Sequence, residues 1–305
     1  MKHDQASRTA KFVSNGIYWV SRQPGLSVEV PPPLRRATEA MTWQINPRLR
    51  SGNGKLQQAL LLKRCQLLQA ASVPGIYLYQ VLRKRCIEAL ARTVVGGGVG
   101  QMVVIGGGFD TLSLRLSADL PGLSVIELDH PATQAVKREA VRRSRLPHGH
   151  CSFFPVDLSG QSLQSALAAC PGYRADQPAL LIAEGLTMYL TEPRIREMLE
   201  CLATQATGSK FIFTYMEQRA AGRFDFQDQR LAASLWLGFQ HERFTWGIPG
   251  QELPAFLAAS GLRLLENKTH HDLRQEYLTE KNRAARLAVG ENIALAGGDD
   301  RPTPP

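Results

Sequence analysis

Residues 101–129, QMVVIGGGFDTLSLRLSADLPGLSVIELD, predict a strand, a glycine turn, a helix and a second strand in direct succession. Met102–Ile105 is a short apolar run rich in β-branched residues, which is typical of a strand buried on both faces. Three glycines follow at 106–108, and glycine tolerates positive φ and lets a ligand approach the backbone closely. Asp110 and Thr111 are residue types that cap a helix N-terminus, so we expect a helix to begin there.

A second apolar strand, Leu123–Leu128, contains Glu127 and is followed by Asp129. In a doubly wound sheet, an acid about 20 residues beyond the glycine turn binds the hydroxyls of a ribose. A dinucleotide fingerprint requires a third glycine at the position where this chain has Thr111. The segment therefore predicts a nucleoside-containing ligand, and it favours a smaller adenosine cofactor over NAD.

Length and composition are those of a globular protein, with 305 residues of which 44% are hydrophobic and 21% charged. This length allows one large α/β domain with an added segment, or two small domains. The chain has no apolar run long enough for a membrane span, and its N-terminal sequence MKHDQASRTAK lacks the apolar core of a signal peptide. We therefore expect a cytoplasmic protein. The five scattered cysteines never have metal-ligand spacing, which predicts reduced, buried thiols and no metal site.

The formal net charge of +9 comes largely from short basic clusters. Such clusters can bind nucleic acid or attract an anionic substrate. They lack interleaved aromatic residues, and the chain has no recognisable nucleic-acid motif, so we expect solvated helix faces and no nucleic-acid partner. The clusters are Arg35-Arg36, Lys63-Arg64, Arg83-Lys84-Arg85 and Lys137–Arg145.

Helical and apolar strand patterns alternate along most of the chain, and this alternation is typical of a parallel sheet. We expect two helices, at 55–71 and from 74 toward 94, before the first strand. The later strands are expected at 151–156, 179–183, 210–214, 262–267 and 291–296, and the last two could be antiparallel at one edge. The predicted fold class is α/β, with a doubly wound, mainly parallel seven-stranded sheet of Rossmann-like type and an N-terminal helical lid.

The predicted regions are a helical lid segment at 1–98, a cofactor-binding domain at 99–297 and a disordered tail at 298–305. The aromatic-rich stretch at about 216–248 is expected to be a substrate-binding insertion in that domain. In an open parallel sheet a ligand lies outside the carboxyl ends of the strands. Four successive strands are followed there by polar or glycine positions, which a core pattern alone would not produce. These positions are 106–108, Asp129, Asp157 and Glu184.

Four segments resemble, in order, the motifs of class I S-adenosylmethionine-dependent methyltransferases of the leucine carboxyl methyltransferase type, which include bacterial O-methyltransferase relatives. They are IGGGFDTLSLRL, IELDHPATQAVKREA, VDLS and IAEGLTMYLTEPRI. The resemblance is strong over roughly 100–215 and weaker in FTWGIPGQELPAFLAASGL and ENIALAGG. SRTAKFV near the N-terminus is similar to a short Thr-Ala segment of the bacterial relatives. The resemblance implies a methyltransferase fold with S-adenosyl-L-methionine as cofactor.

The resemblance also implies a role for each strand-end residue. Asp129 binds the ribose hydroxyls, and Glu127 is its nearby competitor for that role. Asp157 accepts a hydrogen bond from the adenine amine, while Leu158 packs on the adenine ring. Glu184 lies near the amino group of the cofactor, since carboxylates form strong hydrogen bonds with charged donors. The implied positions under the methionine part are Gly106, Gly107 and Gly108.

One position departs from the family pattern, which has a Gly-Tyr-Tyr-x-Arg type stretch whose arginine binds the cofactor carboxylate. Here the stretch 75–79 is GIYLY, and Tyr79 stands where the arginine is expected. Tyr79 could donate one hydrogen bond to the carboxylate, but it brings no charge. Lys63, Arg64 and Arg83 are nearby cations that could replace the arginine; otherwise cofactor affinity is weak or lost.

The methyl acceptor is expected to be the carboxylate or hydroxyl of a small metabolite, and in-line transfer depends on proximity and exclusion of water. A hydroxyl acceptor would need a base, whereas a carboxylate would not. The base candidates are His130, His241 and Tyr215, although each histidine is also typical of a surface or cap position. The substrate-facing candidates are Tyr189, Tyr215, Arg219 and Arg243. The alternatives are a protein or peptide C-terminus as acceptor, a degenerate module without turnover, and a nicotinamide oxidoreductase.

Overall fold

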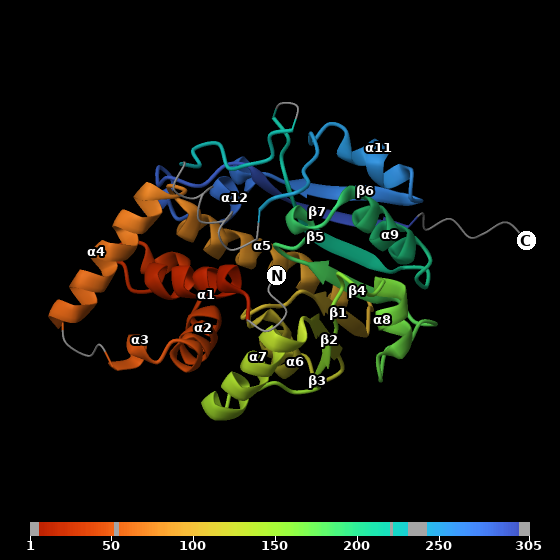
Figure 1. Cartoon of the computed structure of the whole chain (residues 1–305), viewed down its shortest axis with the longest axis horizontal. Coiled ribbons are helices and arrows are strands. Elements are labelled where there is room, and N and C mark those ends of the chain that lie inside the picture. Colours follow the sequence, from red (N-terminus) through yellow and green to blue (C-terminus); the bar gives the residue numbers. More distant parts are fainter. Residues whose placement is uncertain (1–5, 52–54, 220–221, 231–242, 299–305) are drawn as a thin grey trace, which may run out of the picture.

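The computed structural model describes residues 6–51, 55–219, 222–230 and 243–298 (Figure 1). Its centre is a seven-stranded sheet with the order β3-β2-β1-β4-β5-β7-β6. The strands are β1 (Gln101–Ile105), β2 (Ser124–Asp129), β3 (Cys151–Pro155), β4 (Ala179–Ala183), β5 (Lys210–Met216), β6 (Leu262–Lys268) and β7 (Glu291–Gly298). Strands β1 to β5 pair in parallel, whereas β7 is antiparallel to both β5 and β6. The predicted fold class is confirmed.

Helices surround the sheet and connect its strands (Figure 1). The helices are α1 (Arg8–Val20), α2 (Pro32–Ile45), α3 (Arg48–Ser51), α4 (Lys55–Ala71), α5 (Ile76–Gly96), α6 (Leu112–Asp119), α7 (Pro131–Ser144), α8 (Leu163–Ala169), α9 (Glu192–Ala203), α11 (Leu253–Ala258) and α12 (His270–Tyr277). The described ranges also contain three short 3₁₀ turns, η1 (Ser27–Glu29), η2 (Thr187–Tyr189) and η3 (Glu280–Asn282). The division of the chain at residue 98 stays a prediction.

The sheet is buried on both faces because successive side chains of a strand point to opposite sides. In β1, Met102 and Val104 pack on the side of α5, α6 and α7. Val103 and Ile105 belong to the other core, which α8, α9 and α11 cover. This explains why the strands read as continuous apolar runs rather than as alternating patterns.

Helix α5 links the N-terminal helices to the sheet. Thirteen of its residues are buried, among them Tyr79, Leu82 and Ile87. Helix α1 packs against both α5 and α2, and Figure 1 shows α1 to α4 gathered at one side of the molecule. The N-terminal helices are therefore anchored to the sheet through α5.

Part of the predicted insertion at 216–248 lies outside the described residues, and this part includes His241. Its end returns to the sheet, because the Ile248 N–H donates to the Met216 oxygen at 3.0 Å. Of the predicted tail, residues 299–305 also lie outside the described residues. Within the described ranges, no helix is long and apolar enough to span a membrane.

Candidate functional site

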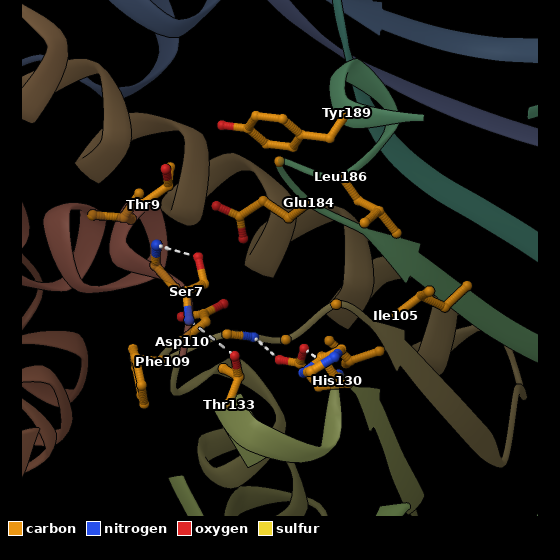
Figure 2. A pocket seen from close by; sticks show the side chains of 18 of the residues that line it. Ser7, Thr9, Ile105, Phe109, Asp110, His130, Thr133, Glu184, Leu186 and Tyr189 are labelled. Atoms are coloured by element: carbon orange, nitrogen blue, oxygen red, sulfur yellow. Dashed lines mark hydrogen bonds between the residues drawn. The ribbon is translucent and has the colours of Figure 1, made fainter. Parts of the chain in front are cut away.

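A cavity of about 780 Å³ lies at the carboxyl ends of β1, β2 and β4, between the sheet and α1 (Figure 2). Its wall includes every strand-end position that the sequence singled out. Those positions are Gly106, Gly107, Gly108, Asp129, Asp157, Leu158 and Glu184. They come from four different strand–helix connections, so parallel strand pairing is what brings them together.

The glycine turn after β1 depends on its lack of side chains. Gly106 and Gly108 have φ values of 70° and 52°, which lie in the left-handed region that favours glycine. A Cβ atom on Gly107 would stand 2.5 Å from the Cδ atom of Glu127. On the cavity side, a Cβ on Gly108 would stand 3.0 Å from the Cβ of Ala10 in α1. The turn is thus packed tightly between β2 and α1.

The structure separates the two acids of β2. The Asp129 carboxylate lines the cavity and accepts hydrogen bonds at 2.6 Å from the backbone N–H groups of Gly108 and His130. Burial raises the pKa of Asp129, and these two backbone hydrogen bonds oppose that shift. Glu127 is fully buried beneath the turn instead, and it accepts from Ser113 Oγ at 2.6 Å and Lys137 Nζ at 2.7 Å. Asp129 is therefore the acid available to a ligand.

His130 and Asp157 form the next part of the wall. The Nδ1 atom of His130 accepts from the Ala132 N–H at 3.3 Å, so this side chain caps α7. Its Nε2 atom lies 4.0 Å from Asp157 Oδ2. Asp157 Oδ1 accepts from the backbone N–H of Ser159 at 2.9 Å. The cap interpretation of His130 is confirmed, and Figure 2 shows this residue on the opposite side of the site from Tyr189.

A buried charged cluster forms the wall between β4 and α5. Glu184 Oε1 accepts from Arg83 Nε at 2.8 Å and from Lys84 Nζ at 3.0 Å. Lys84 Nζ also lies 3.1 Å from Asp110 Oδ1. Burial would raise the pKa of Asp110, but the Lys84 ammonium holds it well below the usual range. The second contact of Arg83 is a pair of hydrogen bonds from Nη1 to the Glu291 carboxylate, at 2.9 and 2.7 Å.

This cluster corrects the expectation of solvated helix faces for Arg83 and Lys84. Their exposed fractions are only 6% and 5%, because carboxylates from three other elements neutralise them. Lys84 and Asp110 were not predicted as site residues. A usable signal was present, since Arg83 follows Tyr79 by four positions and therefore shares its helix face.

Tyr79 does not line the cavity, so its side chain is not placed to contact a cofactor there as predicted. The side chain is fully buried, and its hydroxyl donates to the backbone oxygen of Glu291 at 2.8 Å. Of the three cations proposed to replace an arginine, only Arg83 lines the cavity. Lys63 and Arg64 are exposed on α4.

Two of the four substrate-facing candidates lie together at the cavity. Tyr189 in η2 and Arg243 both line it. The segment that carries Arg243 is held against η2 because the Thr245 N–H donates to the Met188 oxygen at 2.7 Å. The rings of Tyr189 and Phe244 also pack with centroids 5.5 Å apart. Tyr189 and Arg243 therefore belong to one wall of the cavity. Figure 2 shows Tyr189 near Glu184.

The other two candidates, Tyr215 and Arg219, do not line the cavity. Tyr215 is the sixth residue of β5, and its buried hydroxyl lies 3.1 Å from Asn267 Oδ1. Its predicted role as a base is not supported, because burial raises its pKa and the hydroxyl faces amide groups. Arg219 instead forms an ion pair with Asp225 at 3.1 Å.

Helix α1 covers the glycine turn from the side opposite the sheet, and it contributes Ser7, Thr9 and Val13 to the wall. Ser7 is its N-cap: its hydroxyl accepts from the Ala10 N–H at 3.1 Å. The Ser7 N–H donates to Thr133 Oγ1 at 3.1 Å, which ties α1 to α7 (Figure 2). The SRTAKFV segment thus forms part of the site, which was not predicted from the sequence.

A doubly wound sheet whose glycine turn and strand-end carboxylates meet at one cavity is typical of nucleoside-binding α/β proteins. A family model described as leucine carboxyl methyltransferase matches residues 36–203, more than half of the sequence. The chain belongs to the leucine carboxyl methyltransferase family.

Relatives support this assignment. A protein of Frankia alni is 32% identical over 184 residues, covering 54% of this chain and 63% of that protein. YktD of Bacillus subtilis is 26% identical over 204 residues, covering 64% of each chain. Both carry the name "Putative S-adenosyl-L-methionine-dependent methyltransferase". The chain thus spans less than two thirds of the length of these relatives.

A solved structure extends the likeness in fold to nearly the whole chain. The crystal structure of a DUF574 family protein from Streptomyces avermitilis aligns with a TM-score of 0.58 at 13% identity. The alignment covers 96% of this chain and 98% of that one. At this identity the likeness concerns the fold alone.

Proposed function

We propose that this protein is an S-adenosylmethionine-dependent O-methyltransferase that acts on a carboxylate or hydroxyl of a small metabolite. The observation that carries the proposal is the meeting of the glycine turn, Asp129, Asp157 and Glu184 around one cavity. Membership of the leucine carboxyl methyltransferase family agrees with it.

The donor set fits the cofactor in two parts. At the nucleoside end, Asp129 accepts from ribose hydroxyls, Asp157 accepts from the adenine amine, and Leu158 packs on the ring. At the methionine end, Glu184 accepts from the ammonium group and Arg83 donates to the carboxylate. The glycine turn lines the cavity between these two ends and carries no side chain that would fill it. The ammonium and the carboxylate of the ligand thereby each meet an opposite charge, and charge-assisted hydrogen bonds are the stronger kind.

When bound, the cofactor supplies an electrophilic methyl group on a sulfonium. The protein contributes by holding the acceptor in line with that group and by excluding water, for which α1 and the sheet enclose the site from two sides. Tyr189 and Arg243 line the same cavity as Glu184, and Arg243 brings a positive charge to an anionic acceptor. Because His130 is engaged as a helix cap beside Asp157, the geometry favours a carboxylate, which needs no base.

Calorimetric titration with S-adenosylmethionine and with S-adenosylhomocysteine tests the cofactor site. We expect micromolar binding that weakens by at least about tenfold in Asp129→Ala and in Asp157→Ala, since each loses a hydrogen-bonding carboxylate. Asp176→Ala is the matched control, because Asp176 is exposed and outside the cavity. If neither ligand binds the wild-type protein, the proposal fails and a module without turnover becomes the better interpretation.

Turnover then tests the acceptor class. Purified enzyme would be given cofactor with panels of small carboxylic acids, phenols and peptides with a free C-terminus, and formation of S-adenosylhomocysteine would be measured. We expect turnover with small carboxylic acids and a higher KM for them in Arg243→Ala than in the wild type. Turnover confined to peptides would overturn the small-metabolite assignment.

A further inference from the structure

The guanidinium of Arg83 is held on two of its three nitrogen atoms. Nε donates to Glu184 and Nη1 donates to both oxygens of Glu291. Among the described residues, Nη2 has no hydrogen-bond partner. It lies 3.8 Å from the point where a Cβ on Gly185 would stand, and both residues line the cavity. A buried cation therefore offers one unused donor at the cavity wall.

Glu291 is fixed in place through its backbone as well as its side chain. It is the first residue of β7, is 1% exposed, and pairs with Met216 of β5. Its backbone oxygen accepts from the Tyr79 hydroxyl at 2.8 Å. Tyr79 and Arg83 are one helical turn apart on α5, so this helix contacts Glu291 at two points. The Tyr79 ring is itself packed edge-on against Phe226, with centroids 6.4 Å apart.

The charge balance of the cluster indicates what kind of ligand it suits. The carboxylates of Glu184, Glu291 and Asp110 face the cations Arg83 and Lys84, which leaves one negative charge in excess. The ammonium of Lys84 already lies 3.0–3.2 Å from three carboxylate oxygens of Glu184 and Asp110, whereas the Arg83 guanidinium keeps Nη2 for a ligand. A suitable ligand therefore has a cation for the carboxylates and a hydrogen-bond acceptor for Arg83 Nη2. An amino-acid group has both, because its ammonium compensates Glu184 and its carboxylate can accept from Nη2.

We propose that Glu291 and Tyr79 are positioning residues, which orient Arg83 so that Nη2 faces the carboxylate of the amino-acid end of the ligand. This inference rests on the proposed function, since it concerns how one end of the same cofactor is bound. Without the Glu291 carboxylate, the guanidinium keeps only its contact with Glu184 and is free to rotate. Without the Tyr79 hydroxyl, Glu291 keeps its strand pairing but loses its direct tie to α5.

Two probes separate orientation of Arg83 from general damage to the site. S-adenosylhomocysteine has the nucleoside and the amino-acid end, whereas 5′-methylthioadenosine has the same nucleoside and sulfur but no amino acid. Calorimetric titrations of both probes would be made with the full-length wild type, Glu291→Gln and Tyr79→Phe. Glu200→Gln is the matched control, because Glu200 is an exposed residue of α9 outside the cavity.

For Glu291→Gln we expect the Kd of S-adenosylhomocysteine to rise roughly ten- to one-hundred-fold, as for loss of a charged hydrogen bond. For Tyr79→Phe we expect a smaller rise of about two- to tenfold, since a neutral hydrogen bond is lost. The Kd of 5′-methylthioadenosine should stay within about twofold of the wild type in both variants. Tyr79→Phe retains all charges, so it serves as a second test if Glu291→Gln folds poorly.

Equal weakening of both probes would overturn the inference, because Glu291 would then support the site only in a general way. An unchanged Kd for S-adenosylhomocysteine in both variants would overturn it as well, and would leave the proposed function intact. If the wild type binds neither probe, the proposed function fails and this inference fails with it.

Discussion

Replacing Lys137 by methionine should strongly destabilise the fold. Lys137 Nζ lies 2.7 Å from the Glu127 carboxylate, and both side chains are 0% exposed. Removing one partner of a buried pair leaves an uncompensated charge, which costs about 3–5 kcal/mol. For a chain of 305 residues we expect the melting temperature to fall by roughly 5–8 °C.

The loss should depend on pH in a defined direction. Burial raises the pKa of Glu127 even in the presence of Lys137, and removing Lys137 raises it further. A carboxyl whose pKa is higher in the folded state stabilises the fold at low pH, and that contribution is lost as pH rises through the folded-state pKa. The deficit of Lys137→Met should therefore be largest at about pH 8 and should shrink toward about pH 5.

Urea unfolding at several pH values, followed by circular dichroism, measures both effects. The double variant Glu127→Gln/Lys137→Met removes both charges, so it should be more stable than Lys137→Met at about pH 8. Lys281→Met is a matched control at an exposed lysine and should change stability by less than about 0.5 kcal/mol. A loss below about 1 kcal/mol in Lys137→Met, or one that grows as pH falls, would refute the reasoning.

Three further outcomes can be measured. Gly107→Ala should lower the free energy of unfolding by about 1–3 kcal/mol in thermal unfolding, because its Cβ would stand 2.5 Å from Glu127 Cδ. Gly160→Ala is the control, because a Cβ there has open space, and equal stability of the two variants would contradict the predicted clash. His130→Ala should cost about 1 kcal/mol in urea unfolding through loss of the α7 cap, and a change within error would argue against capping. Ellman's reagent should label the native protein slowly and all five cysteines rapidly in denaturant, because burial raises the pKa of three thiols to about 12; rapid labelling of native protein would disprove this. Those three are Cys65, Cys86 and Cys151.

Most of the fold could be predicted because its signals are local. A strand buried on both faces is a continuous apolar run, so the predicted bounds of β4 match those found, Ala179–Ala183. The residues that line the cavity could be predicted because ligands bind at the carboxyl ends of parallel strands. This rule needs only the order of the strands and the residues that follow them. The predicted helix at α4 is also present. Leu60, Leu67 and Leu68 are nevertheless exposed there, because apolar periodicity predicts a helix but not which element its apolar face packs against.

The errors concern contacts between distant parts of the chain. Spacing alone aligns Tyr79 with an expected arginine, whereas Glu291, which both Tyr79 and Arg83 contact, is 208 residues from Arg83. Tyr215 was placed after a strand end because the apolar run stops near Thr214. In the structure β7 extends the pairing of β5 to Met216, so Tyr215 is an interior strand residue.

The position of β7 between β5 and β6 affects when, during synthesis, the chain can bind a ligand. During synthesis, the segments that carry the glycine turn, Asp129, Asp157 and Glu184 leave the ribosome well before residue 291, and N-terminal parts of a chain can begin to fold first. Glu291, the second partner of Arg83, arrives only with β7. If the cofactor binds as proposed, a nascent chain that ends before this strand would have the groups for the nucleoside but would lack Glu291. Full affinity for the amino-acid end would then be acquired only after β7 has paired with β5.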